Sequence, residues 1–210
     1  MTPRPALVIA TLLLLSGGPV LVGCAPAPVA LAPRPIATPT ASPTSEAPSI
    51  GTRSAALEPV REPVPPTRVQ VEAAGIDVSV VPVGVQPDGY MELPPDVAIA
   101  GWYRFGADPG SALGTTVISA HVDSLEYGLG PFSQLKTLGV GALITVTSAD
   151  GAASVYSVES VQSILKDQLP LAEVFDREWS PRLVLITCGG QFNSEQLNYS
   201  DNIVVVAVPV

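Results

Sequence analysis

Histidine, cysteine and basic residues are scarce in this chain. Its 210 residues include 1 histidine and 2 cysteines, and 10 lysines and arginines stand against 19 aspartates and glutamates. A zinc site needs several Cys or His ligands close together, so this residue supply predicts no metal site. A glycine-rich phosphate-binding loop is also missing, and we expect no other cofactor. The formal net charge of −9 argues against nucleic acid as a partner and against charge-driven docking on anionic lipid.

Residues 1–24 are typical of an export signal. Arg4 supplies a positive start, residues 6–15 are almost wholly apolar, and a Gly-Gly-Pro turn follows. The run is shorter than the roughly 20 apolar residues of a membrane-spanning helix, but it fits the core of a signal peptide. Its end, Leu21-Val22-Gly23-Cys24, resembles the bacterial lipoprotein box and predicts a lipid on Cys24. An ordinary signal or an uncleaved anchor remains the alternative.

Residues 25–66 predict a disordered tether. They are rich in Pro, Ala, Ser and Thr, and 14 of the 23 prolines lie at or before Pro66. Such a segment buries too little apolar surface to offset its ordering entropy. At a polyproline rise of about 3.1 Å per residue, it could hold a domain up to roughly 100 Å from a membrane. Residues 67–210 remain, which is enough chain for one domain with its own core.

The pattern of residues 67–210 is that of an all-β domain. Alternating or β-branched runs predict strands over 68–72, 77–85, 90–93, 115–121, 142–148, 153–161, 182–187 and 202–208. Pro82 indicates an edge or a bulge in the second of these. Short helical turns are expected only at 133–138 and 171–175. Such a series of short strands predicts a closed barrel or a sandwich, and the pattern does not choose between them.

Two residues in this domain point to chemistry. His121 is the only histidine of the chain, and Cys188 is the only cysteine of the predicted domain; each closes a predicted strand. With Cys24 outside the domain, no intramolecular disulfide is expected. A thiol can attack an amide carbonyl, and an imidazole can protonate the leaving amine near neutral pH. The pair is therefore a candidate for cysteine acyl transfer, provided that the fold brings the two side chains together.

Four sequence blocks resemble the sortases, and among them the class F group of actinobacteria. The blocks are Gly101-Trp102-Tyr103-Arg104-Phe105-Gly106 with Pro109-Gly110, Ser119-Ala120-His121-Val122-Asp123-Ser124, Ile186-Thr187-Cys188-Gly189-Gly190, and Asp201-Asn202-Ile203-Val204-Val205. This resemblance spans the whole predicted domain. It implies an eight-stranded β-barrel with short helices in the connections.

The resemblance also implies a reaction and its partners. Cys188 would attack the Thr carbonyl of a Leu-Pro-x-Thr-Gly-like sorting signal and form a thioacyl-enzyme. His121 would protonate the departing amine. An amine of a wall precursor or of a protein lysine would then accept the acyl group. The protein would be an exported monomer, anchored at the outer face of the cytoplasmic membrane and facing the cell wall.

The chain departs from the resemblance at one residue. Sortases carry an arginine near the strand after the cysteine, but here no Arg or Lys follows Arg182, and Ser200 occupies the corresponding position. Asn202 could donate its side-chain amide to an oxyanion instead, or Arg104 could reach in from a loop. The alternatives are a strand-edge hydrogen bond for Asn202 and a surface ion pair for Arg104.

Other candidates are weaker. Thr187 and Gly189 could contact substrate beside the thiol, and Leu171 and Val174 could line the groove for the Leu-Pro part of a signal; strand structure and core packing are the alternatives. Asp123 could orient His121 or cap a turn.

The competing functions are a sortase-like module that binds without catalysis, or with weak catalysis, and an L,D-transpeptidase. The 67 positions between His121 and Cys188 argue against the L,D-transpeptidase, whose His and Cys normally lie close in sequence.

Overall fold

The computed structural model describes residues 61–210. The predicted signal over residues 1–24, its Cys24 and residues 25–60 of the predicted tether lie outside the described residues. The elements, in chain order, are β1 (Pro66–Val71), η1 (Glu72–Ala74), β2 (Ile76–Val83), β3 (Ile99–Tyr103), β4 (Thr115–Ser119), β5 (Asp123–Ser124), β6 (Gly128–Leu129), η2 (Pro131–Thr137), β7 (Leu143–Ser148), β8 (Ala153–Leu165), η3 (Lys166–Gln168), α1 (Leu171–Val174), β9 (Arg182–Asn193) and β10 (Asn198–Pro209). None of the helices in this range is long and apolar enough to cross a membrane.

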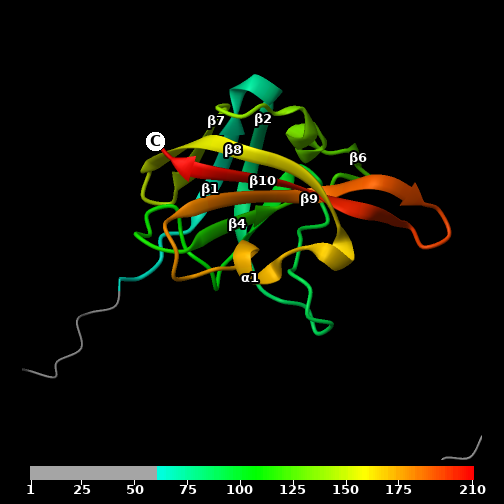
Figure 1. Ribbon diagram of the computed structural model, residues 1–210, viewed down its shortest axis with the longest axis horizontal. Helices are drawn as coiled ribbons and strands as arrows, with labels where there is room; N and C mark the ends of the chain where they lie inside the picture. Colours follow the sequence, from blue (N-terminus) through cyan, green and yellow to red (C-terminus); the bar gives the residue numbers. More distant parts are fainter. Residues whose placement is uncertain (1–60) are drawn as a thin grey trace, which may run out of the picture. The chain divides into compact units, whose positions relative to one another are not determined.

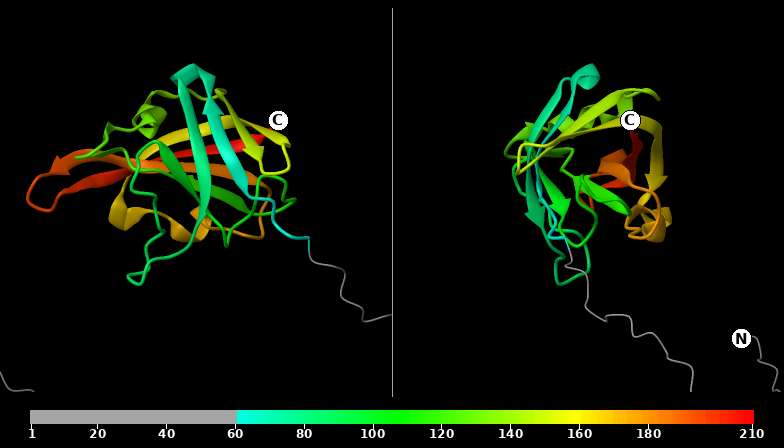
Figure 2. Two further views of the ribbon diagram at one scale, coloured as in Figure 1. Left: turned by 180° about the vertical axis from the view of Figure 1, so that it is seen from behind. Right: turned by 90° about the vertical axis from the view of Figure 1, so that its left-hand side faces the viewer.

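Eight strands close into a barrel in the order β1-β2-β3-β4-β9-β10-β8-β7, and β7 pairs again with β1 (Figures 1 and 2). Two neighbouring pairs, β2 with β3 and β4 with β9, run parallel. The short strands β5 and β6 form a separate hairpin. This architecture confirms the predicted eight-stranded barrel with short helices in its connections.

The strand predictions differ from the structure at several places. The short strands β5 and β6 were not predicted, and β8 extends four residues beyond its predicted end at residue 161. Strand β3 was not predicted, because Gly101 interrupts a five-residue strand that has no apolar alternation. The strand predicted over residues 90–93 is wrong, since only a single bridge, Val85 with Met91, forms there. Strands β9 and β10 extend several residues beyond their predicted ends, into a hairpin that projects from the barrel (Figure 1). Pro82 lies at a strand edge as predicted: it pairs with β3, while the pairing of β2 with β1 covers only residues 76–79.

Two apolar layers hold the barrel. The larger cluster fills the interior with side chains from all eight strands and from η2, and Phe132 and Leu135 are fully buried in it. A smaller cluster lies on the outside, where Val174 of α1 packs over Val184 and Ile186 of β9. Along β9 the interior residues Leu183 and Leu185 alternate with these two outer residues, because successive side chains of a strand point to opposite faces. The domain therefore has an outer apolar face as well as a core.

The chain joins the barrel slightly before the predicted boundary at residue 67. Arg61 forms a 2.9 Å ion pair with Asp108, and the N–H of Val64 donates to the same carboxylate. Ser111 donates to it as well, at 2.5 Å. We call these four residues the Asp108 anchor. Burial opposes the charge of Asp108, but the hydrogen bonds from Arg61, Ser111 and Val64 outweigh it and lower the pKa of its carboxyl group.

Candidate active site

Strand pairing brings the segment that carries His121 next to the strand that carries Cys188. Strands β4 and β9 pair in parallel from Thr115 with Arg182 to Ser119 with Ile186. The N–H of Ala120 extends this ladder with a 3.2 Å bond to the carbonyl of Ile186. Strand β4 ends at Ser119, and His121 follows two residues later; the carbonyl of Ala120, just before it, accepts a hydrogen bond from Thr187, just before Cys188.

A third polar residue lies on the other side of the thiol. Strand β10 pairs with β9 so that Asn202 stands directly opposite Cys188. Neighbouring strands lie about 4.8 Å apart, so Cys188 and Asn202 are adjacent across β9 and β10, while His121 follows the end of β4, which pairs with the other edge of β9. We call these three residues the outer row.

The outer row projects from the outside of the barrel. Cys188 shares the parity of Val184 and Ile186, and Asn202 shares that of Val204, and these three apolar residues belong to the outer cluster. All three residues of the row are partly buried. They continue the outer apolar face at its edge.

Two side-chain hydrogen bonds fix the strand ends that carry the row. Ser119 Oγ donates to the carbonyl of Ile186 at 2.9 Å, and Thr187 Oγ1 donates to the carbonyl of Ala120 at 2.8 Å. Thr187 is buried, with 2% of its surface exposed. Its hydroxyl thus holds the segment before His121 and is not presented to the groove.

The glycines after Cys188 shape the hairpin. A Cβ on Gly189 would lie 2.6 Å from Ile203, and a Cβ on Gly190 would overlap Ser200 and Asp201. Gly190 has φ +77, which side-chain-bearing residues rarely adopt. Four residues of β9, Gly189 to Phe192, oppose three of β10, Tyr199 to Asp201, so β9 contains a bulge at Gly190. In this structure Gly189 is required by its close approach to β10.

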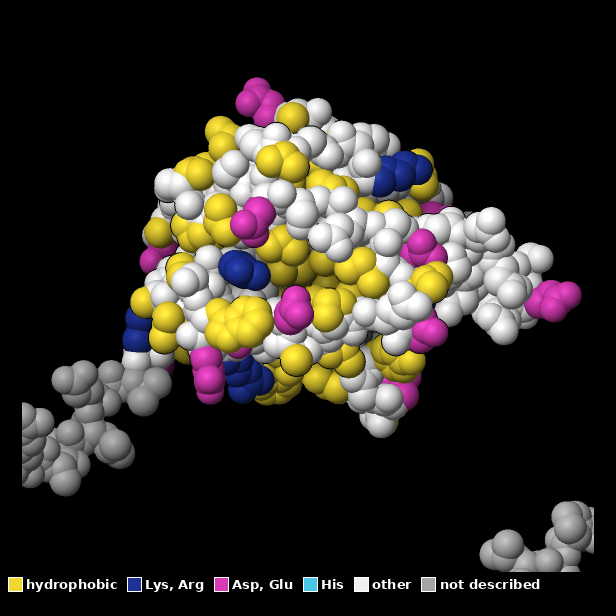
Figure 3. Space-filling model, in the orientation of Figure 1, with side chains coloured by type: hydrophobic (Ala, Val, Ile, Leu, Met, Phe, Trp, Pro, Cys, Tyr) yellow, Lys and Arg dark blue, Asp and Glu magenta, His cyan; other side chains and the backbone are white. Residues whose placement is uncertain are grey.

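An apolar groove borders the outer row. A cavity of about 90 Å³ lies between α1 and the outer faces of β8–β10, lined by Gln162, Ile164, Pro170, Glu173, Val174, Arg182, Val184, Val204 and Val206. Figure 3 shows hydrophobic side chains gathered at the centre of this face. Ile164 pairs with Asn202, so the groove begins next to the row. Of the two predicted groove residues, Val174 is buried here, whereas Leu171 is 61% exposed.

Arg104 lies far from the row. The antiparallel register of β3 and β4, Trp102 with Ile118, sets Arg104 opposite Thr116, which precedes His121 by five residues, or about 16 Å. Its guanidinium stacks over Phe105, 4.9 Å from the ring centre.

Sequence reasoning missed Tyr199. Its hydroxyl donates a 2.5 Å hydrogen bond to Asp123, two residues after His121. The pKa of Tyr199 is raised, first by this hydrogen bond and then by burial and by the charges of Asp123 and Cys188. The backbone of Asp123 pairs with Leu129 in the β5–β6 hairpin, and its carboxylate accepts the hydrogen bond from Tyr199. No motif marks Tyr199, because its position depends on the bulge at Gly190.

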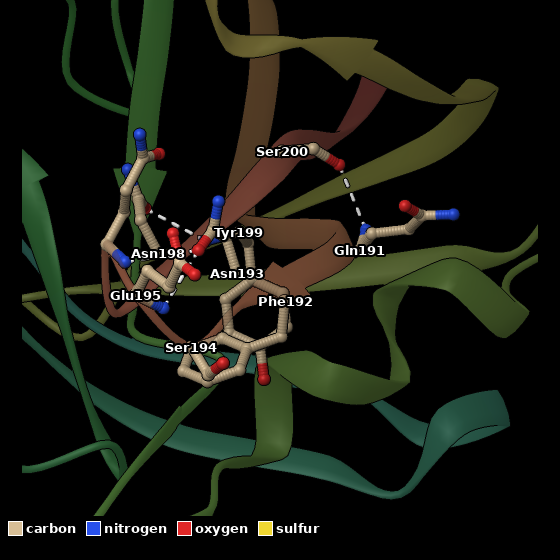
Figure 4. A pocket seen from close by; sticks show the side chains of 9 residues that line it. Gln191, Phe192, Asn193, Ser194, Glu195, Asn198, Tyr199 and Ser200 are labelled. Carbon is tan, nitrogen blue, oxygen red and sulfur yellow. Dashed lines mark hydrogen bonds between the residues drawn. The ribbon is translucent and has the colours of Figure 1, made fainter.

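A larger hollow lies at the tip of the β9–β10 hairpin. It has a volume of about 540 Å³ and is lined by residues 191–196 and 198–200. Figure 4 shows the rings of Phe192 and Tyr199 next to each other in its wall, with their centres 5.0 Å apart. Ser200 Oγ accepts a 2.9 Å hydrogen bond from the N–H of Gln191, which braces the two strands at the bulge.

Comparison with protein-family models matches residues 69–210 to the Sortase domain. The chain belongs to the sortase family. A comparison with curated proteins found no match.

Solved sortase structures share the fold of this domain. Sortase A from Corynebacterium diphtheriae matches with a TM-score of 0.51 and 19% identity over 71% of this chain and 62% of its own. Streptococcus agalactiae sortase C1, in complex with MTSET, matches with a TM-score of 0.53 and 19% identity over 68% of this chain and 66% of its own. Sortase C-1 from Actinomyces oris matches with a TM-score of 0.50 and 17% identity over 68% of this chain and 72% of its own. The chain described here therefore spans less than two thirds of the length of each of the first two of these sortases.

Proposed function

We propose that this sortase is a cysteine transpeptidase that cleaves a Leu-Pro-x-Thr-Gly-like sorting signal and transfers the acyl part to an amine. The outer row supports this proposal, because Cys188 and Asn202 pair across β9 and β10 beside an apolar groove, and the segment that carries His121 is hydrogen-bonded to β9 next to Cys188. The four sequence blocks that resemble class F support an assignment to that class.

The three residues of the outer row have distinct roles in the two half-reactions. The Cys188 thiolate attacks the Thr carbonyl carbon, and Asn202 donates its amide N–H to the oxyanion that develops. When the Thr-Gly bond breaks, the imidazolium of His121 gives its proton to the leaving amine. In the second half-reaction His121 takes a proton from the incoming amine, the amine attacks the thioester, and the Cys188 thiolate leaves.

The groove explains how a sorting signal would be held. Its valine and isoleucine floor and Val174 of α1 suit the Leu-Pro part of the signal, since apolar burial supplies most of the affinity in such sites. Arg104 has no part in this mechanism, because it follows the end of β3 and lies opposite Thr116, five residues before His121.

The setting of the reaction follows from the N-terminal sequence. An export signal, a lipid on Cys24 and an extended tether would hold the domain outside the membrane and within reach of wall precursors or protein lysines. Intact-mass analysis of the protein extracted from membranes tests the lipid: a diacylglyceryl adduct on Cys24 supports it, and an unmodified or uncleaved N-terminus contradicts it.

A cleavage assay tests the enzymatic proposal. The full chain in detergent is incubated with fluorogenic peptides that carry several Leu-Pro-x-Thr-Gly variants, with and without an amine acceptor. We expect cleavage that Cys188→Ala abolishes, and a ligated product in the presence of the amine. An absence of Cys188-dependent cleavage with every variant would count against catalysis.

One observation favours a second candidate, a sortase-like module that binds sorting signals without catalysis. Asn202 stands opposite the thiol, and no arginine is available from β10. This module would bind signal peptides equally well with Cys188→Ala, and its Cys188 would show ordinary thiol reactivity. Selective alkylation of Cys188 at neutral pH excludes it, since fast alkylation requires a thiolate.

A further inference from the structure

His121 lies in a short segment that is held on both sides. Before it, the carbonyl of Ala120 accepts the hydroxyl of Thr187 at 2.8 Å. After it, the carboxylate of Asp123 accepts the hydroxyl of Tyr199 at 2.5 Å. Both donors belong to the β9–β10 hairpin, which also carries Cys188. The two bonds therefore connect the strand pair of the thiol to both ends of the segment of the imidazole.

The two bonds differ in surroundings. The bond from Thr187 is buried and continues the register of β4 with β9. The bond from Tyr199 is partly buried and joins residues 76 positions apart, beyond the end of that ladder. Strand β4 ends at Ser119, so His121 itself has no strand partner. Within residues 61–210, Tyr199 is the one side chain of β9 or β10 that is hydrogen-bonded to the segment after His121.

The local sequence explains why Tyr199 reaches Asp123. Gly190 permits the bulge in β9, and the bulge sets Tyr199 opposite Phe192. The two rings pack with their centres 5.0 Å apart (Figure 4), which restricts the rotation of the phenol. On the other side, the pairing of Asp123 with Leu129 holds the carboxylate in the β5–β6 hairpin. Both partners of the hydrogen bond are thus restrained before they meet.

We propose that Tyr199 and Asp123 are a positioning pair, which keeps the imidazole of His121 beside the thiol of Cys188 and touches no substrate. A hydrogen bond between a phenol and a carboxylate is charge-assisted and stronger than a neutral one. It acts on a segment whose displacement by about 1 Å can lower a rate 100-fold. For its effect on turnover, this inference rests on the proposed function.

Kinetics of four variants of the full chain test the pair. We expect Tyr199→Phe and Asp123→Ala each to lower kcat by about 10- to 100-fold, with KM within about twofold. The double variant should be no slower than the slower single variant, because both changes remove one bond. Asp123→Asn keeps an acceptor for the phenol and should retain kcat within about threefold of wild type. The proposal would be overturned if the loss of kcat in the double variant were the product of the two single losses, or if Asp123→Asn were as slow as Asp123→Ala.

The matched control is Tyr127→Phe. Tyr127 is a phenol in the turn between β5 and β6, 48% exposed, and its hydroxyl makes no hydrogen bond in the described part of the chain. This variant should keep the kcat of wild type. A loss of kcat in Tyr127→Phe equal to that in Tyr199→Phe would show that removal of any phenol hydroxyl near the β5–β6 hairpin slows the enzyme. That result would contradict a specific role of the Tyr199–Asp123 pair.

A second readout does not need turnover. Because His121 is the only histidine, its ring protons give one unambiguous set of NMR signals in the untagged full chain. We expect a nuclear Overhauser effect between these protons and the β-protons of Cys188 in wild type and in Tyr127→Phe, and a weaker one in Tyr199→Phe and Asp123→Ala. An unchanged effect in the last two variants overturns the pair even if wild type proves inactive. Absent turnover with an effect that weakens as expected contradicts the proposed function alone.

Discussion

The two ends of strand β4 carry polar groups in opposite situations. Ala107 bonds to the carbonyl of Thr115 at the start of the strand, so the Asp108 anchor lies there. Its carboxylate has 0% side-chain exposure and accepts hydrogen bonds from three residues. At the other end lies the outer row, whose side chains are partly exposed. No side-chain hydrogen bond joins its three members in the range 61–210.

This difference separates stability from chemistry. A buried carboxylate with all its partners present contributes to folding, and removal of either side leaves an unpaired charge or donor. Polar groups that lack partners beside an apolar face contribute little to folding, but they remain available to a substrate. We therefore expect substitutions at one end of β4 to change the free energy of unfolding, and substitutions at the other end to change turnover.

The largest effect is expected from the thiol and the imidazole. Cys188→Ala should reduce cleavage to background, and His121→Ala should lower kcat/KM by about 10²- to 10⁴-fold through loss of the general acid. Cys188 on β9 and His121 beyond the end of β4 are both partly exposed, so Tm should stay within about 2 °C of wild type. Parallel peptide cleavage and thermal unfolding measure this. A large fall in Tm would show that the outer row also stabilises the fold, and would contradict the proposed difference between the two ends of β4.

Asn202 should follow next. If its amide stabilises the oxyanion, Asn202→Ala should lower kcat by about 10²- to 10³-fold with little change in KM. Asn198→Ala, on the same strand in the hairpin, is the matched control and should stay near wild type. Steady-state kinetics separate the two. Equal kcat values for Asn202→Ala and wild type would contradict the proposed role of Asn202 as a hydrogen-bond donor to the oxyanion.

The Asp108 anchor should show the reverse pattern. Asp108→Ala leaves buried donors unpaired and should lower the free energy of unfolding by about 3 kcal/mol, which is a fall in Tm of about 6–12 °C for a domain of this size. Turnover per folded molecule should not change. Denaturant unfolding and cleavage kinetics check both statements.

Asp77 provides the matched control for the anchor. It pairs with Arg68, but both side chains are about half exposed, and exposed pairs contribute little. Asp77→Ala should leave Tm unchanged. If Asp77→Ala and Asp108→Ala proved equally destabilising, burial would not be the cause of the anchor's strength.

The smallest expected effect is on acid stability. Burial disfavours the charge of Asp108, but the hydrogen bonds from Arg61, Ser111 and Val64 outweigh it and lower its pKa in the folded state. An unfolded aspartate has a pKa of about 3.9. The stabilisation is therefore complete above that pH and is lost as the pH falls through the lower pKa of the folded state.

Free energies of unfolding of wild type and Asp108→Asn, measured between pH 7 and pH 2, test this sign. The two curves should converge at the acid end. A constant gap down to the lowest pH would mean that the carboxylate is not the titrating group.

Most of the barrel could be predicted from the sequence, because seven of its strands carry runs such as Thr115 to His121 or Arg182 to Thr187 that bury one or both faces. Strand β3 could not, since its pairing with β2 and β4 is what buries it. The extensions of β9 and β10 were also missed. Residues 189–193 and 198–201 are mostly glycine and polar residues without apolar alternation, and only the backbone ladder of the hairpin makes them strands.

The candidate residues could be named from the sequence, but their arrangement could not. The single His121 and Cys188 stood out by their rarity. That Asn202 lies opposite Cys188, and Arg104 far away, depends on strand register, which no local pattern specifies. Tyr199 was hidden for the same reason, since the bulge at Gly190 determines what it faces.

Mass spectrometry of the acylated protein tests the central claim most directly. The full chain is quenched in acid within seconds of mixing with an excess of a Leu-Pro-x-Thr-Gly peptide and then digested. The outer row predicts an adduct of the Leu-Pro-x-Thr acyl group on the peptide that contains Cys188, removable by hydroxylamine and absent from His121→Ala at the same time point. No adduct on Cys188 with any sorting signal, while the thiol remains free to alkylation, would contradict it.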